Sequence, residues 1–353
     1  RVHYLEHPSL APLRQLMTDP TVSEIMINCP QKLFVERGGR IEKAPLIFPT
    51  PLHLNTCIES LVSFSGRAVN AKSPFVDFRL PDGSRVNVVI APIALDGPVV
   101  TIRRAIKSIR RMEDIIKRGS LTPKMGAFLE ACVGAHANIV FSGGTGSGKT
   151  TLLAMLSASI NPEERVVVIE DTAELDLQLP HVVRMECRPP NMEGVGGITL
   201  ADLLKNSLRM RPTRLILGEV RGEEAFDLLS AFSSGHSGGF AVVHASSPAQ
   251  AVSRLELMVL SRGLPYPLWA IQSQISNAID IIVQHAMMPD GVRRVTEITS
   301  VQGTGNDSVL LQDIFHYDHD EQRYICTGEE PQCMPRLRRV MGSIDAIIQG
   351  GPA

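Results

Sequence analysis

Eight consecutive residues near the middle of the chain have the types and the spacing that hold a phosphate group. Residues 143–150 read Gly-Gly-Thr-Gly-Ser-Gly-Lys-Thr and match the pattern G-x-x-x-x-G-K-[ST] in full. Glycines let the backbone fold around a β-phosphate with its N–H groups pointing inward. The lysine reaches the β- and γ-phosphates, and the last threonine offers its hydroxyl to Mg²⁺. The sequence therefore predicts a site for a nucleoside triphosphate and Mg²⁺. The residues expected to form it are Gly143, Gly144, Thr145, Gly146, Ser147, Gly148, Lys149, Thr150 and Thr151.

The segments on both sides of this loop support the same prediction. Residues 138–141 are a short apolar stretch of strand type, and residues 151–156 have the composition of a helix. A strand, a glycine-rich loop and a helix in this order place the bound anion at a helix N-terminus, where backbone N–H groups lack partners. A glycine-rich turn without a ligand is the alternative, and this setting argues against it.

Carboxylates follow two further apolar strands downstream of the loop. Residues 166–169 lead into three acids, of which Glu170 is the first and Glu174 the last, and residues 215–217 lead into Glu219. At the strand ends of an α/β nucleotide site, carboxylates coordinate Mg²⁺ and position an attacking water. A helix cap and solvated surface charges are the alternatives for the first cluster. Strand-end acids are common, so Glu219 alone is a moderately specific signal.

Two histidines bracket the next apolar strand. His236 lies in a glycine-rich turn before residues 240–243, and His244 follows them. Neither has a second histidine three or four residues away, so a zinc site is not favoured. A lone histidine is more often a structural residue. At the end of a strand beside the triphosphate, however, His244 is placed to sense the γ-phosphate.

The four clusters, in this order and at this spacing, resemble the secretion ATPase superfamily, whose hexameric motors serve type II and type IV secretion and type IV pili. In that family they are called Walker A, the Asp box, Walker B and the His box. The resemblance is closest to the CpaF/TadA branch, which drives tight-adherence (Flp) pili. It begins at residues 20–28, continues through residues 80–87 and 208–212, and ends near residue 298. The family usually has an acidic residue where Ser237 stands, so the His box departs from its pattern.

This resemblance implies a fold, cofactors and partners. The implied fold class is α/β: a RecA-like P-loop domain with a mostly parallel sheet, preceded by a smaller α+β, PAS-like domain with an antiparallel sheet. ATP and Mg²⁺ are the implied cofactors, with the nucleotide between the two domains. Six copies are expected to form a ring at the cytoplasmic face of the inner membrane. The implied partners are platform proteins of the pilus or secretion machine, and no nucleic acid is expected.

The resemblance also assigns roles to single residues. Glu174 corresponds to the water-activating acid and Glu219 to the Walker B acid, which faces Mg²⁺ through water. The sequence does not decide which of these two is the base. Arg85 and Arg103 correspond to N-terminal arginines that reach toward the γ-phosphate. The full catalytic set is Glu174, Glu219, Lys149, Arg103, Arg85, His244 and His236, and the metal set is Thr150, Glu219 and Glu170.

The elements that must position these residues suggest two domains. The chain has 353 residues, of which 44% are apolar and 20% charged, and this fits two ordinary globular domains. Short strands around a Pro-Asp-Gly turn at residues 81–83 are typical of an antiparallel sheet with one solvated face. After residue 138, strands and helices alternate as in a largely parallel α/β sheet. We expect an N-terminal domain over residues 1–106, a linker over residues 107–122 and a RecA-like domain with C-terminal hairpins and a helix over residues 123–353.

Charge, cysteine and hydropathy patterns limit the remaining classes of protein. The chain has 35 Lys and Arg against 37 Asp and Glu, which argues against a strongly electropositive nucleic-acid surface. Its six cysteines include no C-x-x-C pair, which favours reduced thiols of a cytosolic protein over a disulfide framework or a zinc site. No apolar run approaches the roughly 18 residues of a membrane span, and no signal peptide is visible, so any role at a membrane is expected to be peripheral.

Three functions compete at this point. The first is a motor that converts ATP hydrolysis into movement of one domain against the other, and so extrudes pilin or a secreted substrate. The second is a RecA-like translocase on nucleic acid, which needs a basic, aromatic-lined channel, whereas the chain has one Trp and four Tyr. The third is a regulatory protein that binds nucleotide and hydrolyses little, against which the intact acids argue. The residue pattern favours the motor.

Overall fold

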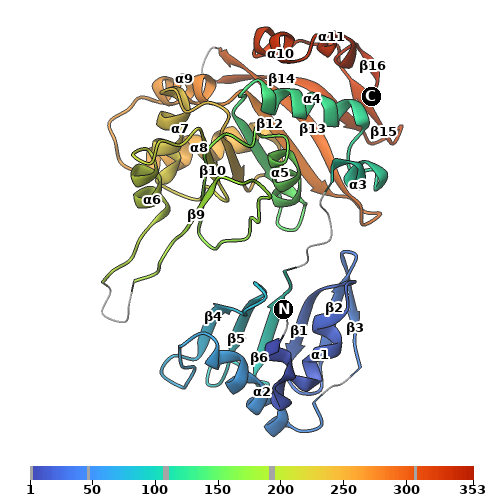
Figure 1. The fold of residues 1–353 in the computed structure, drawn as a ribbon, viewed down its shortest axis with the longest axis vertical. Helices are drawn as coiled ribbons and strands as arrows, with labels where there is room; N and C mark the ends of the chain where they lie inside the picture. Colours follow the sequence, from blue (N-terminus) through green and yellow to red (C-terminus); the bar gives the residue numbers. More distant parts are fainter. Residues whose placement is uncertain (1–2, 46–47, 106–110, 191–194, 306–307) are drawn as a thin grey trace. The chain divides into compact units, whose positions relative to one another are not determined.

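The computed structural model describes residues 3–45, 48–105, 111–190, 195–305 and 308–353. The chain divides into two compact units, residues 1–108 and residues 109–353, which are described separately here (Figure 1). Among the described residues, none of the helices combines the length and the hydropathy needed to cross a bilayer.

The N-terminal unit is a six-stranded antiparallel sheet in the order β3-β2-β1-β6-β5-β4, with helices packed on one face (Figure 1). The Pro-Asp-Gly turn joins β4 to β5, and Gly83 has φ +89° there, a conformation that glycine adopts without strain. The elements of this unit are α1 (Ala11–Thr18), α2 (Pro51–Ser63), β1 (Val22–Asn28), β2 (Leu33–Arg37), β3 (Arg40–Lys43), β4 (Phe75–Arg79), β5 (Arg85–Val89) and β6 (Val99–Arg103), with 3-10 turns at His3–Glu6 and Pro8–Leu10.

Alternation along the central strands separates a buried face from a solvated one. Val86 and Val88 of β5, and Val100 and Ile102 of β6, are fully buried with the apolar side chains of α1 and α2. The residues that alternate with them along the strands, including Arg85, point to the other face. The antiparallel sheet with one solvated face is therefore confirmed.

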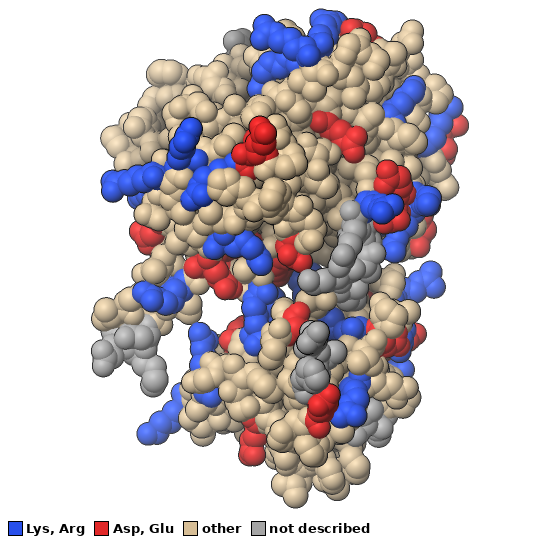
Figure 2. All heavy atoms as spheres, viewed as in Figure 1, with Lys and Arg blue, Asp and Glu red and all other residues tan. Residues whose placement is uncertain are grey.

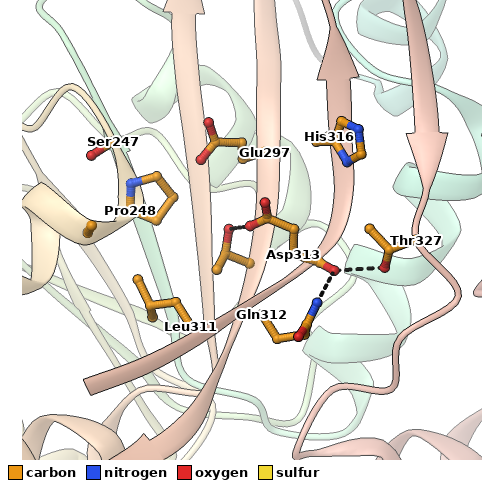
Figure 3. Close-up of a pocket in the computed structure, with 10 residues that line it drawn as sticks. Ser247, Pro248, Glu297, Leu311, Gln312, Asp313, His316 and Thr327 are labelled. Carbon is orange, nitrogen blue, oxygen red and sulfur yellow. Dashed lines mark hydrogen bonds between the residues drawn. The ribbon is translucent and has the colours of Figure 1, made fainter. Parts of the chain in front are cut away.

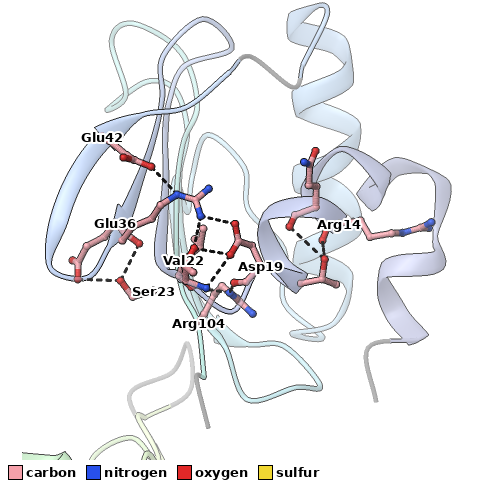
Figure 4. Close-up of polar contacts among 11 residues, drawn as sticks. Arg14, Asp19, Val22, Ser23, Glu36, Glu42 and Arg104 are labelled. Atoms are coloured by element: carbon pink, nitrogen blue, oxygen red, sulfur yellow. Dashed lines mark hydrogen bonds and ion pairs between the residues drawn. The ribbon is translucent and has the colours of Figure 1, made fainter. Parts of the chain in front are cut away.

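Polar contacts hold the start of β1 beside the end of β6 (Figure 4). The guanidinium of Arg104 donates to the backbone carbonyls of Asp19 and Val22, the second at 2.7 Å. The Asp19 carboxylate in turn pairs with Arg37 at the end of β2. Three strand ends that are distant in sequence are thus held together next to Arg103.

The C-terminal unit is built on a ten-stranded mixed sheet in the order β16-β15-β14-β13-β12-β7-β11-β10-β8-β9. Strands β7 to β12 are parallel to one another, and β13 to β16 extend the sheet in antiparallel hairpins. Its strands are β7 (Ile139–Gly143), β8 (Val166–Glu170), β9 (Val182–Glu186), β10 (Arg214–Leu217), β11 (Phe240–Val243), β12 (Ile281–Met287), β13 (Arg293–Thr304), β14 (Val309–Asp318), β15 (Arg323–Cys326) and β16 (Gly351–Pro352). Its helices are α3 (Met112–Lys117), α4 (Pro123–Gly134), α5 (Lys149–Ser157), α6 (Leu200–Ser207), α7 (Glu224–Ser233), α8 (Pro248–Ser261), α9 (Leu268–Ala278), α10 (Met334–Val340) and α11 (Ile344–Ile347).

Helices cover both faces of this sheet and create two cores. In β7, Ile139 and Phe141 pack with α4, α5, α10 and α11, whereas Val140 between them packs with α7, α8 and α9. Strands that are buried on both faces are typical of parallel α/β sheets. The predicted fold class is confirmed, with the addition that nearly half of the sheet is formed by the C-terminal hairpins.

The segment expected to be a linker, residues 107–122, is partly helical. The first residues of the expected linker, 107–110, lie outside the described part of the chain. From Met112 onward the chain forms α3, whose Ile115 is buried in the core that contains α4. The carbonyl of Ser120 accepts hydrogen bonds from Val295 N and from the Tyr324 hydroxyl, both at 2.8 Å. The later part of the expected linker thus packs as part of the C-terminal unit.

Candidate functional site

The predicted phosphate loop connects the end of β7 to the start of α5. Gly143, Gly146 and Gly148 have backbone φ values of +151°, +74° and +102°, which residues other than glycine rarely adopt. Lys149 and Thr150 stand in the first turn of α5, directly after the loop. The Lys149 ammonium donates to the carbonyls of Gly143 (2.8 Å) and Gly144 (2.6 Å). The loop thus joins a strand to a helix N-terminus through glycine conformations, and its lysine is turned back onto the loop carbonyls.

Strand register brings the other predicted groups to the same edge of the sheet. Ser142 of β7 pairs with Val243 of β11, and Ala241 of β11 pairs with Leu217 of β10. Leu217 pairs in turn with Ile169 of β8. Because these four strands are parallel, their carboxyl ends meet at one edge, where α/β proteins bind ligands.

His244 links the phosphate loop to the acid that follows β10. Its Nδ1 lies 3.4 Å from the Lys149 ammonium, and its Nε2 lies 3.2 Å from Oε1 of Glu219. Burial, together with the charge of Lys149, lowers the pKa of His244 below its ordinary value, so the ring is neutral at pH 7. A neutral ring that accepts from Lys149 at Nδ1 and donates Nε2–H to Glu219 satisfies both contacts.

The second oxygen of Glu219 is held by an arginine that the sequence analysis did not single out. Arg221 donates to Glu219 Oε2 at 2.6 Å and lies 3.2 Å from Asp171 Oδ2 at the end of β8. Burial acts to raise the pKa of Glu219, but the hydrogen bond and charge of Arg221, with the charges of His244 and Lys149, outweigh it and lower this pKa. Glu219 is therefore an anion at neutral pH.

Glu170 supports the turn that carries Glu174. The Glu170 side chain is 3% exposed, and its Oε1 accepts from the backbone N–H groups of Glu174 (2.7 Å) and Leu175 (2.9 Å). A Cβ placed on Gly218 would lie 2.7 Å from Glu170 Cγ, so the two strand ends are tightly packed. Burial raises the pKa of Glu170 despite the two backbone hydrogen bonds. One oxygen of this expected metal ligand is thus committed to the backbone, whereas Glu174 itself is exposed.

The structure does not bring His236 to the phosphate loop. The residues after it pair with the beginning of β7, not with its end: Gly239 O accepts from Ile139 N, and Gly239 N donates to the Asn138 side chain. Gly238 is held there by Arg214, which is 1% exposed. His236 therefore lies at the amino-terminal end of β11 and His244 at its carboxyl end, on opposite edges of the sheet.

Two residues missed in the sequence flank the loop from the β12–β13 hairpin. His285 of β12 pairs with Gly143 and is 4% exposed, and burial with the charge of Lys149 lowers its pKa to about 3. The Arg293 side chain passes Gly148, with its Cδ 3.6 Å from where a Cβ would stand. No motif marks these residues, because their role depends on the pairing of β12 with β7.

The two arginines expected to reach the γ-phosphate belong to the N-terminal unit. Arg85 of β5 and Arg103 of β6 are register partners, so their side chains share the solvated face of that sheet. They form a pair of adjacent positive charges.

The donor set of the C-terminal unit suits Mg²⁺ bound together with a nucleotide. No group of three or more His, Cys, Asp or Glu residues that could hold a metal ion is found among the described residues. Mg²⁺ commonly takes one or two protein oxygens, substrate phosphates and water. The Thr150 hydroxyl and the Glu219 carboxylate, beside a phosphate loop, match that requirement.

A separate pocket of about 480 Å³ lies on the face of the sheet that α8 covers (Figure 3). Its walls include Ser247 and Pro248 at the start of α8, with Glu297 and Asp313 from the C-terminal hairpins. The ten described residues that line it include none of those predicted from the sequence. The pocket is therefore distinct from the phosphate-loop site.

Two neighbouring glycines provide a direct test of the loop geometry. A Cβ on Gly143 would lie 2.5 Å from the carbonyl oxygen of His285, whereas a Cβ on Gly144 would meet no atom within 4 Å. Overpacking costs about 1–3 kcal/mol, and we expect Gly143→Ala to lower the melting temperature of the full chain by roughly 4–10 °C. Thermal unfolding followed by circular dichroism measures this shift. Equal melting temperatures for Gly143→Ala and the control Gly144→Ala would contradict the geometry described.

Comparison with known proteins agrees with this arrangement. The family described as "Type II/IV secretion system protein" matches residues 6–329. A putative conjugal transfer protein of Mycobacterium tuberculosis is 31% identical over 312 residues, which cover 87% of this chain and 88% of that protein. The protein VirB11 of Agrobacterium fabrum is 31% identical over 307 residues, 78% of this chain and 87% of its own.

A solved structure agrees at the level of the fold. The ATPase DotB of Legionella pneumophila has a TM-score of 0.57 and 19% identity over 95% of this chain and 85% of its own. Because the family matches most of the chain and relatives above 30% identity span more than two thirds of it, the chain belongs to the type II/IV secretion system protein family.

Proposed function

We propose that this chain is a motor that hydrolyses ATP with Mg²⁺ to power assembly of a pilus of the tight-adherence (Tad/Flp) type or secretion through a type II or type IV machine. The observation that carries the proposal is the chain of contacts from Lys149 through His244 to Glu219. It connects the phosphate loop with the acid after β10 within hydrogen-bond reach. A loop that binds phosphate without hydrolysis needs no such connection.

Each residue has a defined part in this proposal. The Lys149 ammonium exchanges the carbonyls of Gly143 and Gly144 for the β- and γ-phosphates. Thr150 and Glu219 hold Mg²⁺, which when bound draws charge from the phosphates. Glu174, on the turn that Glu170 supports, orients and activates the attacking water, although Glu219 remains an alternative base.

His244 and the arginine pair connect the nucleotide state to movement. When Lys149 turns to the phosphates, its contact with His244 Nδ1 changes, so His244 responds to the γ-phosphate. Arg85 and Arg103 add charge-assisted contacts with ATP that weaken with ADP. A ligand shifts a conformational equilibrium only by its differential affinity, and this difference supplies it.

The assembly and location follow from the family resemblance. We propose a ring of six copies at the cytoplasmic face of the inner membrane, coupled to platform proteins of the machine. Head-to-tail contacts close into a ring when the rotation between neighbours permits it. The resemblance to the CpaF/TadA branch supports the pilus system, and the match to the type II/IV secretion system protein family supports secretion.

A nucleic-acid translocase is the alternative function, and the charge distribution does not favour it. On the face seen in Figure 2, basic side chains are interspersed with acidic ones rather than forming a continuous basic surface. Non-specific binding to nucleic acid depends mainly on Lys and Arg at phosphates. ATP hydrolysis that nucleic acid strongly stimulates would favour the alternative.

Replacing the loop lysine tests the proposal as a whole. Lys149→Ala removes the charge that contacts the β- and γ-phosphates, and we expect the rate of ATP hydrolysis to fall by about 10²-fold or more. Phosphate release by the full chain measures it. Lys124→Ala, whose ammonium contacts only the Pro352 carbonyl in the described structure, is the matched control. Near-normal hydrolysis by Lys149→Ala would remove this loop from the active site.

The two candidate acids are separated by isosteric substitution. Glu174→Gln and Glu219→Gln keep the side-chain shape and lose the charge, so we expect both to bind nucleotide and to lose about 10²–10⁴-fold in turnover. Binding of a fluorescent ADP analogue and phosphate release measure the two effects separately. The variant with the larger loss in turnover and unchanged metal dependence identifies the base. A variant with wild-type turnover would exclude its residue from catalysis.

The contribution of the N-terminal unit is tested at Arg103. Arg103→Ala should lower turnover by about tenfold or more, because arginines that contact a transferring phosphoryl group contribute about 10³–10⁵-fold. Nucleotide binding, measured by fluorescence, should persist since the phosphate loop is intact. Arg40→Ala, an exposed arginine of β3 in the same sheet, is the control. Wild-type turnover in both Arg85→Ala and Arg103→Ala would reject this role.

A further inference from the structure

Both carboxylate oxygens of Glu219 are already engaged. Oε1 contacts His244 Nε2 at 3.2 Å, and Oε2 accepts from Arg221 at 2.6 Å. Each oxygen has a further lone pair, but a cation that approaches Oε2 meets the positive guanidinium of Arg221 beside it. Because Glu219 is proposed to face Mg²⁺, one of its two partners is expected to give way to the metal.

The backbone that carries Arg221 is fixed. Gly218 N and Val220 N donate to Ile169 O (2.9 Å) and Val242 O (2.8 Å), the neighbouring strand ends. Oε1 of Glu224, which is 6% exposed, accepts from Arg221 N (2.6 Å) and Gly222 N (3.0 Å). The backbone of Arg221 is therefore held in place, and only its side chain can change position.

The arginine is easier to displace than the histidine. The Arg221 side chain is 56% exposed and has a second carboxylate partner, Asp171, at 3.2 Å. The Arg221 guanidinium can release Glu219, keep its contact with Asp171 and stay exposed to solvent. His244 is less exposed, at 34%, so water is less able to replace its contact with Glu219. A divalent cation at Glu219 also repels the guanidinium directly.

We propose that Arg221 is an internal counter-ion of Glu219: it occupies the Glu219 carboxylate in the nucleotide-free protein and gives it up to Mg²⁺ when nucleotide binds. The inference rests on the proposed function, in which Glu219 faces Mg²⁺. Arg221 and the metal compete for one oxygen, so each weakens the binding of the other by the same factor. Arg221 is a positioning residue that holds the Glu219 carboxylate in place until metal and nucleotide arrive.

A metal titration of the full chain tests the inference without measuring hydrolysis. Mn²⁺ is titrated into protein with saturating ADP, and free Mn²⁺ is measured by electron paramagnetic resonance. Arg221→Gln removes the competitor, and we expect the half-saturating Mn²⁺ concentration to fall about two- to fivefold, the factor that a partly exposed ion pair contributes. The Glu224 contacts use backbone N–H groups, so the substitution leaves them in place.

Arg338→Gln is the matched control. Arg338 also bridges two carboxylates, Glu330 at 2.6 Å and Asp345 at 2.7 Å, with a side chain 44% exposed, and it lies in α10. Its removal subtracts the same charge from the protein but should leave Mn²⁺ binding unchanged. A shift of equal size in Arg338→Gln would mean that net charge, not occupancy of Glu219, sets the affinity, and would overturn the proposal.

Glu219→Gln separates failure of the inference from failure of the proposed function. We expect it to weaken Mn²⁺ binding and to abolish the effect of Arg221→Gln in the double variant, because both act through one carboxylate. Weaker Mn²⁺ binding in Glu219→Gln with unchanged or weaker binding in Arg221→Gln overturns the counter-ion inference alone. Unchanged Mn²⁺ binding in Glu219→Gln overturns the metal role of Glu219, and the inference with it.

Discussion

The parallel register of β7, β11, β10 and β8 is the constraint on which the C-terminal site depends. Parallel strands end at a common edge, and in this sheet that edge collects the phosphate loop, His244, Glu219 and the turn with Glu174. The residues come from four separate segments and touch only because the strands are in this order. The same register explains why His236 is excluded: it precedes β11, whereas His244 follows it.

In the structure the charged groups of the site have polar partners within the protein. Lys149 is bound to two loop carbonyls and contacts a neutral histidine, and Glu219 is bound to that histidine and to Arg221. A buried charge without a partner is costly, so the site needs these internal partners. In the proposed function, nucleotide and metal binding is an exchange of partners, in which the phosphates replace the carbonyls at Lys149 and the metal replaces Arg221 at Glu219. Such an exchange links the presence of nucleotide to the positions of several strand ends.

The sequence predicted the parts of this protein that local patterns determine. The glycine loop, the apolar strands that precede the predicted acids and the Pro-Asp-Gly turn appear in the structure where the residues placed them. Contacts that depend on pairing between distant segments could not be predicted. His285 and Arg293 approach the loop only because β12 pairs with β7. Ile115, in the segment expected to be a linker, is buried because α3 packs in the core that contains α4. Arg221 follows a predicted acid by two residues, but its partner Asp171 lies on another strand.

Burial decides which arginines hold the fold and which can change partners. Arg214 is 1% exposed. Each of its three guanidinium nitrogens donates a hydrogen bond inside the protein, to Glu164, Gly238 O and Val133 O. Releasing it would remove the guanidinium that pairs with the largely buried Glu164, a costly loss away from water, which makes Arg214 a permanent part of the sheet. Arg221 contacts carboxylates at a similar distance, yet more than half of its side chain is in water, so solvent can replace each contact. Two arginines with the same chemistry at the two ends of β10 therefore act differently: one fixes the strand and the other regulates the acid at its end.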